Sequence, residues 1–233
     1  SPYGFLWYFT ADTIHFYASN AGGANYSFTD AENPVSRWVH YAIVRNGNNF
    51  NAYQNGNQIG STWTYTGSIN NVGGYLQIGL LNDNNHVTGH IGMLSNVRIM
   101  NRAVYTDEFD PPSKPFNPKE NGTLLLCCAD PTAGDISGHN HESHYSTVGT
   151  SIRVRQVNPW NNDYPWVAPD GYNSIYFPTN SSKAEFAISN LPTGASARSV
   201  ELWVFITDTA YAGTSYIVAY GFNGTNQVFS VCV

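Results

Sequence analysis

Charged residues are scarce in this chain of 233 residues: Asp, Glu, Lys and Arg make up 11% of it, less than half of the usual share of about 25%. Lys and Arg number 10 against 16 Asp and Glu, the formal net charge is -6, and no run of basic residues occurs. These features argue against a groove that binds nucleic-acid phosphates. The surface must instead be covered by Asn, Ser, Thr, Gly and Tyr, which is typical of an extracellular or virion-surface β-protein.

Long apolar runs are missing too, since none reaches the roughly 18 residues that a membrane span requires. Disorder is equally unexpected, because 42% of the residues are hydrophobic and 15% are aromatic, enough to build a sizeable core. The sequence starts at Ser1 without an initiator Met or a signal peptide, as expected of a processed or excised chain.

Cysteine is limited to Cys127, Cys128 and Cys232. Neighbouring residues of a strand point to opposite faces, so Cys127 and Cys128 cannot both reach Cys232. We expect the thiols to be buried as small hydrophobic side chains, and a single disulfide is the alternative.

Helix signals are nearly absent, whereas β-branched and aromatic runs bounded by Asn-Gly, Gly-Gly and Pro recur along the chain. Asn55-Gly56 predicts a two-residue hairpin turn, because both residues tolerate a positive φ. About a dozen strands at this spacing predict an all-β sandwich or jelly roll. The predicted strands span residues 4–9, 13–18, 37–45, 50–54, 58–65, 75–80, 90–100, 123–128, 174–177, 184–188, 199–206, 216–220 and 227–233.

Two irregular segments interrupt this pattern. Four prolines within residues 109–121 predict an extended linker, since proline is excluded from central strands. Residues 157–172 are rich in proline, tryptophan and tyrosine, so we expect a long ordered loop there.

The first half of the chain carries two motifs of recognisable spacing. One fits W-x-H-x-A-x-x-R followed by Y-x-[ND]-G, through Trp38, His40, Ala42, Arg45, Tyr53, Asn55 and Gly56. The other, residues 92–103, is similar to the closing strand G-x-[IL]-D-[DE]-[VL]-R-I-x-N-x-A-x-Y. Together they resemble the laminin-G-like branch of the concanavalin A-like lectin/glucanase superfamily. The resemblance implies a concanavalin A-like jelly-roll β-sandwich of two antiparallel sheets.

The second half resembles the start of another such domain. Residues 122–128 and 135–141 match its opening strand and turn, and residues 174–177 and 200–204 match its early strands. The Leu-Leu-Cys-Cys variant is similar to tandem laminin-G-like domains in structural proteins of marine phages.

The order of the two halves is therefore permuted. Residues 1–117 resemble the C-terminal half of the family domain and residues 118–233 its N-terminal half, with a linker at about 110–122. The sequence therefore predicts the strands of one complete domain, which assemble either within one chain or between neighbouring chains. It is either a circular permutant or one repeat of a tandem array, and the second arrangement implies homo-oligomers or head-to-tail copies.

Catalysis is not expected from the carboxylates. Glycoside hydrolysis needs two carboxyl groups about 5–5.5 Å apart, or about 6.5–9.5 Å apart in inverting enzymes. Glu201 lies in a predicted strand with no acidic residue two or four positions away, and Asp107, Glu108 and Asp110 lie at the linker. The sequence thus predicts that the protein is not an enzyme.

Two metal sites are conceivable, although no cofactor is required. His139, His141 and His144 lie beside Asp135 and Glu142 in a spacing that suits a transition metal or, alternatively, a hydrogen-bonded turn. A loop of carboxylate and amide oxygens that would suit calcium is formed by Asn82, Asp83, Asn84 and Asn85. Ser95 and Asn96 replace the acidic residues of the closing-strand motif, which weakens a calcium site there.

Carbohydrate binding needs aromatic faces for sugar C–H groups and polar side chains for hydroxyls. The loop residues that meet this need are Trp63, Tyr65, Asn82, Asp83, Asn84, Asn85, His86, Trp160, Tyr164 and Trp166, although packing is the alternative role of each tryptophan. We expect a non-enzymatic, extracellular or virion-surface adhesion module that binds a surface glycan, on a phage appendage or fibre. A purely structural, self-assembling fibre or capsid-decoration protein without a small ligand is the alternative.

Overall fold

The computed structural model is built from strands, and the residues that it describes include no helix. Accordingly, the described residues offer no helix that is long and apolar enough to cross a membrane. The structure describes residues 5–10, 13–18, 24–29, 35–69, 75–83, 86–130, 134–145, 152–155, 158–160, 173–207, 214–222 and 227–231.

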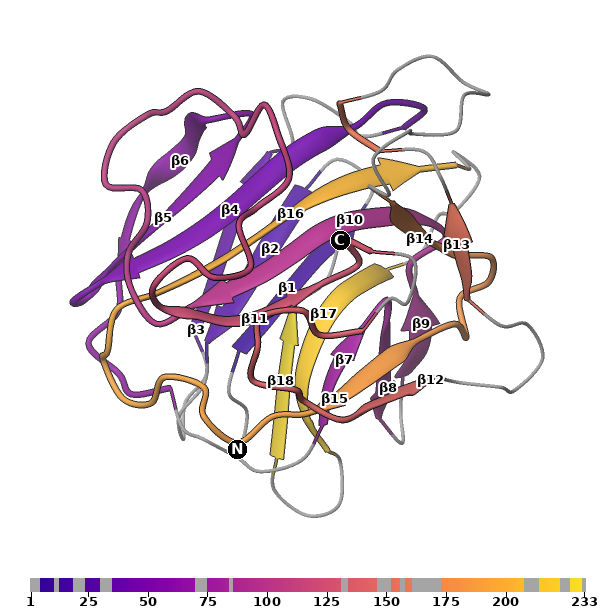
Figure 1. The fold of residues 1–233 in the computed structure, drawn as a ribbon. Helices are drawn as coiled ribbons and strands as arrows, with labels where there is room; N and C mark the ends of the chain where they lie inside the picture. Colours follow the sequence, from indigo (N-terminus) through magenta and orange to yellow (C-terminus); the bar gives the residue numbers. More distant parts are fainter. Residues whose placement is uncertain are drawn as a thin grey trace.

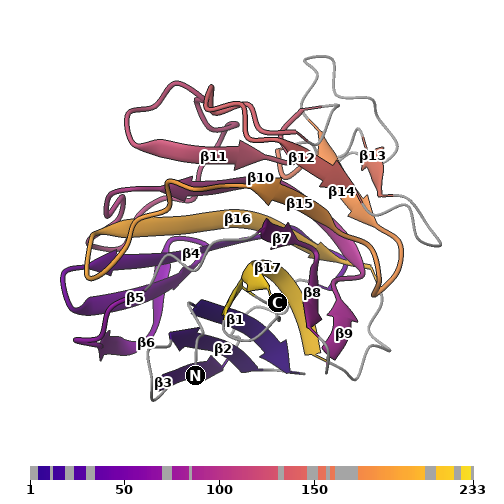
Figure 2. The same ribbon diagram turned by 90° about the horizontal axis from the view of Figure 1, so that it is seen from below.

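Two antiparallel sheets pack face to face, as Figure 2 shows from below. The small sheet has the order β18-β17-β1-β2-β3 and comprises β1 (Phe5–Thr10), β2 (Thr13–Ala18), β3 (Ala24–Thr29), β17 (Thr214–Phe222) and β18 (Gln227–Val231). The large sheet has the order β13-β14-β10-β16-β4-β5-β6 and comprises β4 (Val39–Asn46), β5 (Asn49–Gln54), β6 (Asn57–Thr64), β10 (Gly92–Met100), β13 (Arg153–Arg155), β14 (Ser174–Phe177) and β16 (Arg198–Ile206). The predicted all-β sandwich of two antiparallel sheets is confirmed.

Shorter strands complete the sandwich. β11 (Thr123–Cys127) pairs with β10 beside β14. A further set has the order β12-β15-β7 and comprises β7 (Tyr75–Ile78), β12 (Ser143–Tyr145) and β15 (Ala184–Ala187). β8 (Leu80–Asp83) and β9 (His86–Gly89) form a hairpin that lies against β17.

The large sheet has one face in the core and one face that other parts of the chain cover in part. Val200, Leu202 and Val204 of β16 belong to the main hydrophobic cluster between the sheets. Side chains alternate along a strand, so Glu201 and Trp203 point to the opposite face, which we call the outer face. Both are nevertheless buried, which agrees with the continuous apolar run in this part of the sequence.

Each of the two sheets of the sandwich contains strands from both halves of the chain. In the small sheet β1 pairs with β17. In the large sheet β16 lies between β4 and β10, and β10 also pairs with β11 and β14. In this structure one chain therefore supplies the strands of both halves to a single sandwich.

Local departures from the predicted strands have local causes. The predicted strand over residues 75–80 is divided into β7 and β8 at Gly79, where φ is 85° and a Cβ would meet the Phe177 ring at 2.3 Å. The strands β3, β9, β12 and β13 were not among those predicted from the sequence. The thiols of Cys127 and Cys128 are free and buried, as expected, whereas Cys232 lies outside the described residues.

Candidate functional site

Residues of the sequence motifs meet at a buried ion pair on the outer face of the large sheet. Nε and Nη2 of Arg98 lie 2.8 and 2.6 Å from Oε1 of Glu201. Tyr105 donates its hydroxyl to Oε2 of Glu201 at 2.8 Å, and Nε2 of His40 lies 3.5 Å from the same oxygen. Both oxygens of this carboxylate are therefore engaged, and Glu201 has none free for acid–base catalysis.

The pKa shifts in this cluster favour the charged forms of Arg98 and Glu201. Burial raises the pKa of Glu201, but His40, the charge of Arg98 and the hydroxyl of Tyr105 bring it below its ordinary value. Burial lowers the pKa of Arg98, but Glu201 and Glu120 bring it above its ordinary value. Burial and the charge of Glu201 raise the pKa of Tyr105. A carboxylate, a guanidinium and a neutral phenol are thus the stable forms at neutral pH.

The segment between β10 and β11, residues 101–122, runs across the outer face and is held there by this cluster (Figure 1). Glu120 forms ion pairs with both Arg98 and Arg102. The ring of Phe116 covers the guanidinium of Arg98, with the guanidinium carbon 3.9 Å from the ring centroid. Phe109 packs against a second cluster that includes Tyr53. We call residues 101–122 the crossing segment; it is irregular, as predicted for the linker, but it is packed on the sheet.

The Asn55-Gly56 turn anchors the crossing segment. The φ angles of these two residues are 47° and 82°, which confirms the predicted turn. Oδ1 of Asn55 accepts a hydrogen bond from the N–H of His40 at 2.9 Å, and the carbonyl of Gly56 accepts one from the N–H of Phe109 at 3.0 Å. A Cβ at position 56 would lie 1.6 Å from the carbonyl oxygen of Phe109, so only glycine allows this approach.

Arg45, the last residue of the first motif, has a structural role at one end of the sandwich. Its guanidinium donates hydrogen bonds at 2.8–3.2 Å to the carbonyl oxygens of Gly47, Tyr65, Gly67 and Gly194. Arg198 donates to the same Gly194 carbonyl at 3.0 Å, and burial together with the charge of Arg45 lowers the pKa of Arg198 to about 9. Among the described carboxylates, none pairs with either guanidinium. Backbone carbonyls hold these charges, and the rings of Phe50 and Tyr65 lie 4.9 and 5.8 Å from the guanidinium carbon of Arg45.

Trp63 and Tyr65, two predicted glycan-binding residues, pack between the sheets at the open edge formed by β3 and β6. The ring of Trp63 stacks on Tyr26 at 5.7 Å and on Tyr65 at 5.1 Å between centroids. Phe16 and Phe50 contact the same indole at 5.7 and 5.2 Å. These contacts support the alternative role of Trp63, which is packing.

Trp160 lies on the opposite side of the large sheet. Its ring meets Trp203 edge to face at 5.9 Å, and its Nε1 donates to the carbonyl oxygen of Pro112 at 2.6 Å. Trp203 shares the outer face with Glu201, whereas Trp63 faces the core. A single ligand site therefore cannot contain both Trp63 and Trp160.

The remaining predicted glycan-binding residues are only partly placed. Asn82 and Asp83 lie in β8 and His86 in β9, but their side chains are not among those described. Asn84, Asn85, Tyr164 and Trp166 lie outside the described residues. The contribution of all these residues to a site stays a prediction.

Asp135 forms a turn of backbone hydrogen bonds. Its carboxylate accepts hydrogen bonds from the N–H groups of Leu126, Ser137 and His141 at 2.9–3.2 Å. These contacts fit the hydrogen-bonded turn that the sequence offered as the alternative to a metal site.

His139 and His141 stand next to each other beside this turn, with ring centroids 5.7 Å apart. Their Nε2 atoms lie 3.1 and 3.0 Å from the carbonyl oxygens of Thr123 and Leu124. In the part of the chain that the structure describes, no three His, Cys, Asp or Glu side chains are grouped to hold a metal ion. The side chain of Asp83 is not described, so a calcium site there stays a prediction.

A row of four apolar side chains, three of them partly exposed, crosses the outer face, and the sequence did not reveal it. Tyr176 of β14 and Phe205 of β16 stand opposite Met93 of β10 in the two ladders. Trp38 continues the row, with its ring 5.5 Å from that of Phe205. Trp38, Phe205 and Tyr176 are half-buried. We call Trp38, Met93, Tyr176 and Phe205 the aromatic band.

Unpaired polar atoms accompany the aromatic band. Nε1 of Trp38, Nε1 of Trp203 and Oγ of Ser174 are buried and have no hydrogen-bond partner among the described residues. Ser174 shares its face with Tyr176, and Trp203 shares its face with Phe205, because alternate residues of a strand point the same way. Buried polar atoms normally have partners, so these three atoms are exceptions on this face.

These features define a β-sandwich of the lectin-like jelly-roll class with a half-exposed aromatic row on its large sheet. Residues 2–108 match the family model Laminin_G_3, described as the concanavalin A-like lectin/glucanases superfamily. The family resemblance of the first-half motifs is thereby confirmed. No curated protein and no solved structure matches the chain.

Proposed function

We propose that the protein is a non-enzymatic adhesion module that binds carbohydrate on the outer face of its large sheet. The aromatic band carries this proposal. Sugar rings pack their C–H groups on aromatic faces, and their hydroxyls pair with polar groups beside those faces. The half-buried rings of Trp38, Phe205 and Tyr176 meet the first need.

Binding rather than hydrolysis is supported by the state of the carboxylates on this face. Glu201 is bonded to Arg98 and Tyr105, and Glu120 bridges Arg98 and Arg102. The family description covers both lectins and glucanases. A hydrolase would need two carboxyl groups free to act on the sugar, so the lectin side of the family is the better match.

We propose an extracellular or virion-surface location, on a phage appendage or fibre. The small share of charged residues, 11%, and the resemblance of the second half to phage structural proteins support it. The permuted order of the two halves is part of the same proposal, since a repeat of a fibre would show it.

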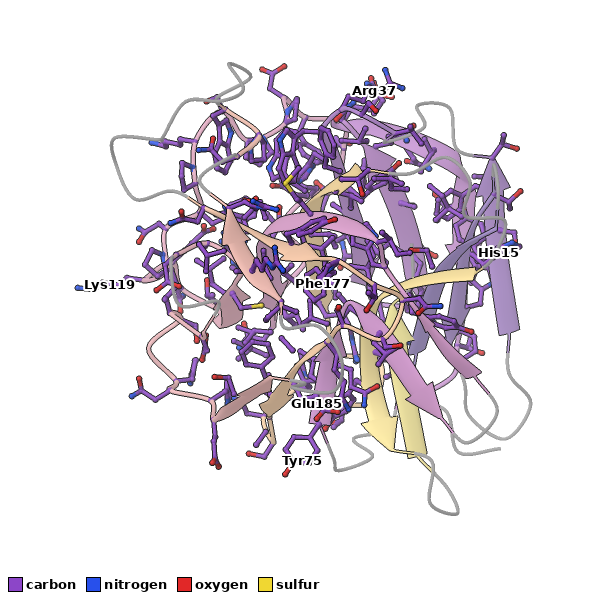
Figure 3. The ribbon with its side chains drawn as sticks, turned by 90° about the vertical axis from the view of Figure 1, so that its right-hand side faces the viewer. His15, Arg37, Tyr75, Lys119, Phe177 and Glu185 are labelled. Atoms are coloured by element: carbon purple, nitrogen blue, oxygen red, sulfur yellow. The ribbon has the colours of Figure 1, made fainter. Side chains whose placement is uncertain are left out.

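Exchange of one tyrosine tests the site. Tyr176→Ala should weaken binding to a glycan found on a printed array at least tenfold, because the sugar loses a stacking surface. Tyr75→Ala is the matched control, since Tyr75, labelled in Figure 3, is an exposed tyrosine (41%) at the start of β7 and stands opposite Ala187 of β15. Affinity is measured by isothermal titration, and the melting temperature shows that both variants fold.

Two results would contradict the proposal. A folded wild-type protein that binds no glycan on the array supports the purely structural alternative. Equal losses of affinity in the Tyr176 and Tyr75 variants would show that the aromatic band is not the site.

A further inference from the structure

Two exposed cations of this acidic chain stand close together on one short strand. All 10 Lys and Arg residues lie in the described part. Half of them are bonded to carboxylates or backbone carbonyls: Arg45, Arg98, Arg102, Lys183 and Arg198. Among the exposed cations, Arg153 and Arg155 stand two residues apart on β13, the outermost strand of the large sheet.

Both arginines lie beside the aromatic band. Arg153 stands directly opposite Tyr176, and Arg155 directly opposite Ser174. Opposite residues of paired strands point to the same face, so the two side chains share the outer face with Tyr176. The guanidinium carbon of Arg155 lies 5.0 Å from the centroid of the Tyr176 ring. Such stacking orients a guanidinium and leaves the N–H donors at its rim available.

Neither arginine has a counter-ion among the described carboxylates. Their Cα atoms are separated by two residues of a strand, or about 7 Å. Guanidinium groups bind carboxylate and sulfate oxygens with two parallel hydrogen bonds, so each arginine offers one such fork.

We propose that Arg153 and Arg155 form an anionic subsite at the end of the aromatic band, and that the glycan bound there carries carboxylate or sulfate groups. The inference rests on the proposed function and adds a chemical class to it. One sugar ring stacks on the band at Tyr176, and its acidic group, or that of the next sugar, pairs with the arginines. The acid group thereby fixes the direction in which the glycan lies across the strands.

Two simpler roles of these arginines lead to different expectations. Charged side chains on an edge strand can prevent pairing with another sheet, in which case their loss causes aggregation and no change in affinity. A general attraction for polyanions would include nucleic acid, but a net charge of -6 and only two adjacent cations oppose it.

The experiment compares three polysaccharides on the full chain: dextran, which is neutral, hyaluronan, which carries carboxylates, and dextran sulfate. An array of neutral, carboxylated and sulfated glycans precedes the titrations. We expect an acidic class to bind at least tenfold more tightly than its neutral counterpart, because charge-assisted hydrogen bonds are roughly twice as strong as neutral ones. The variant Arg153→Gln/Arg155→Gln should lose this preference and keep the neutral affinity. The carboxylated and sulfated arms show which acid is bound.

The matched control is Lys114→Gln/Lys119→Gln, which removes the same charge from exposed residues of the crossing segment. This control should keep the acidic preference. Equal losses in both double variants, or equal binding of single-stranded DNA, would overturn the inference. If the protein binds neutral glycans and shows no preference for acidic ones, only the inference is overturned. If it binds no glycan at all, the proposed function is overturned as well.

Discussion

At the scale of single residues, this protein holds buried charge in two different ways. Arg98 is neutralised by Glu201, and both groups gain further hydrogen bonds from Tyr105 and Glu120. Arg45 donates only to backbone carbonyls, which carry partial charge. Breaking a buried pair such as the first costs about 3–5 kcal/mol, because one charge is left without compensation. Both arrangements give the arginines of the motifs a structural role.

His90 is a buried imidazole that gives stability a pH dependence. It is fully buried, with Nδ1 3.4 Å from Oγ of Ser215 and its ring beside Phe177. Burial lowers the pKa of His90 from 6.5 to about 3. The folded protein therefore keeps this imidazole neutral over a pH range in which the unfolded chain binds a proton.

The free energy of unfolding should consequently fall as the pH drops below about 6.5, by about 1.4 kcal/mol per pH unit from this residue, until the folded pKa is reached. We expect His90→Gln to flatten the slope between pH 6 and pH 4.5, above the range in which most carboxylates titrate. Urea unfolding at half-unit intervals of pH measures this slope. Between pH 7 and pH 8 the difference between the two proteins should be constant, and an unchanged slope in the variant would contradict the assignment.

At the scale of strands and turns, one glycine controls the docking of the crossing segment. Gly56 closes the hairpin between β5 and β6, and its carbonyl binds Phe109. Any side chain at this position would meet the backbone of the crossing segment, whereas a Cβ on Gly47 meets nothing within 4 Å. Both glycines have positive φ, at 82° and 61°. A side chain would therefore cause similar backbone strain at both positions, but only at position 56 would it meet the crossing segment.

Gly56→Ala should therefore destabilise the protein more than Gly47→Ala. The shared cost of the left-handed conformation is about 1–2 kcal/mol, and we expect Gly56→Ala to exceed it by at least about 2 kcal/mol, because a packed backbone must move. Chemical unfolding gives the difference, and limited proteolysis should cut the crossing segment faster in Gly56→Ala. Equal effects of the two substitutions would show that the segment does not depend on this approach.

Strands with strong alternation or turn signals could be predicted from the sequence, and short ones could not. The residues of β4 and β16 were predicted almost to their ends, because β-branched and aromatic side chains mark them. β13 holds only three residues, all exposed, so no alternation of apolar and polar residues indicates it in the sequence. The ion pair of Arg98 with Glu201 joins residues 103 positions apart, and the aromatic band depends on register between three strands. Neither feature can be recognised from the spacing of residues along the sequence.

At the scale of the whole molecule, neither half of the chain holds a complete sheet. β10 pairs only with β11, β14 and β16 among the described strands, and all three come from the second half. β4 likewise has β16 on one edge. The first half alone would expose both edges of β10, one edge of β4 and the apolar face beside them.

Fragments of residues 1–117 and 118–233 should consequently fail to fold separately. We expect neither fragment to show a cooperative thermal transition, and an equimolar mixture to recover one, because the lost pairs form again between fragments. Near-ultraviolet circular dichroism and calorimetry follow the recovery. A cooperative transition in one fragment would mean that its strands pair in some other way.

The position of β16 in the chain also has a consequence during synthesis. β4 and β10 leave the ribosome about 150 and about 100 residues before β16, which corresponds to roughly 5–30 seconds at ordinary rates of translation. During this interval the nascent chain presents two long strands whose central neighbour does not yet exist. A delay at the codons between β10 and β16 would lengthen the exposure, so this protein should depend on chaperones that shield β edges until the second half emerges.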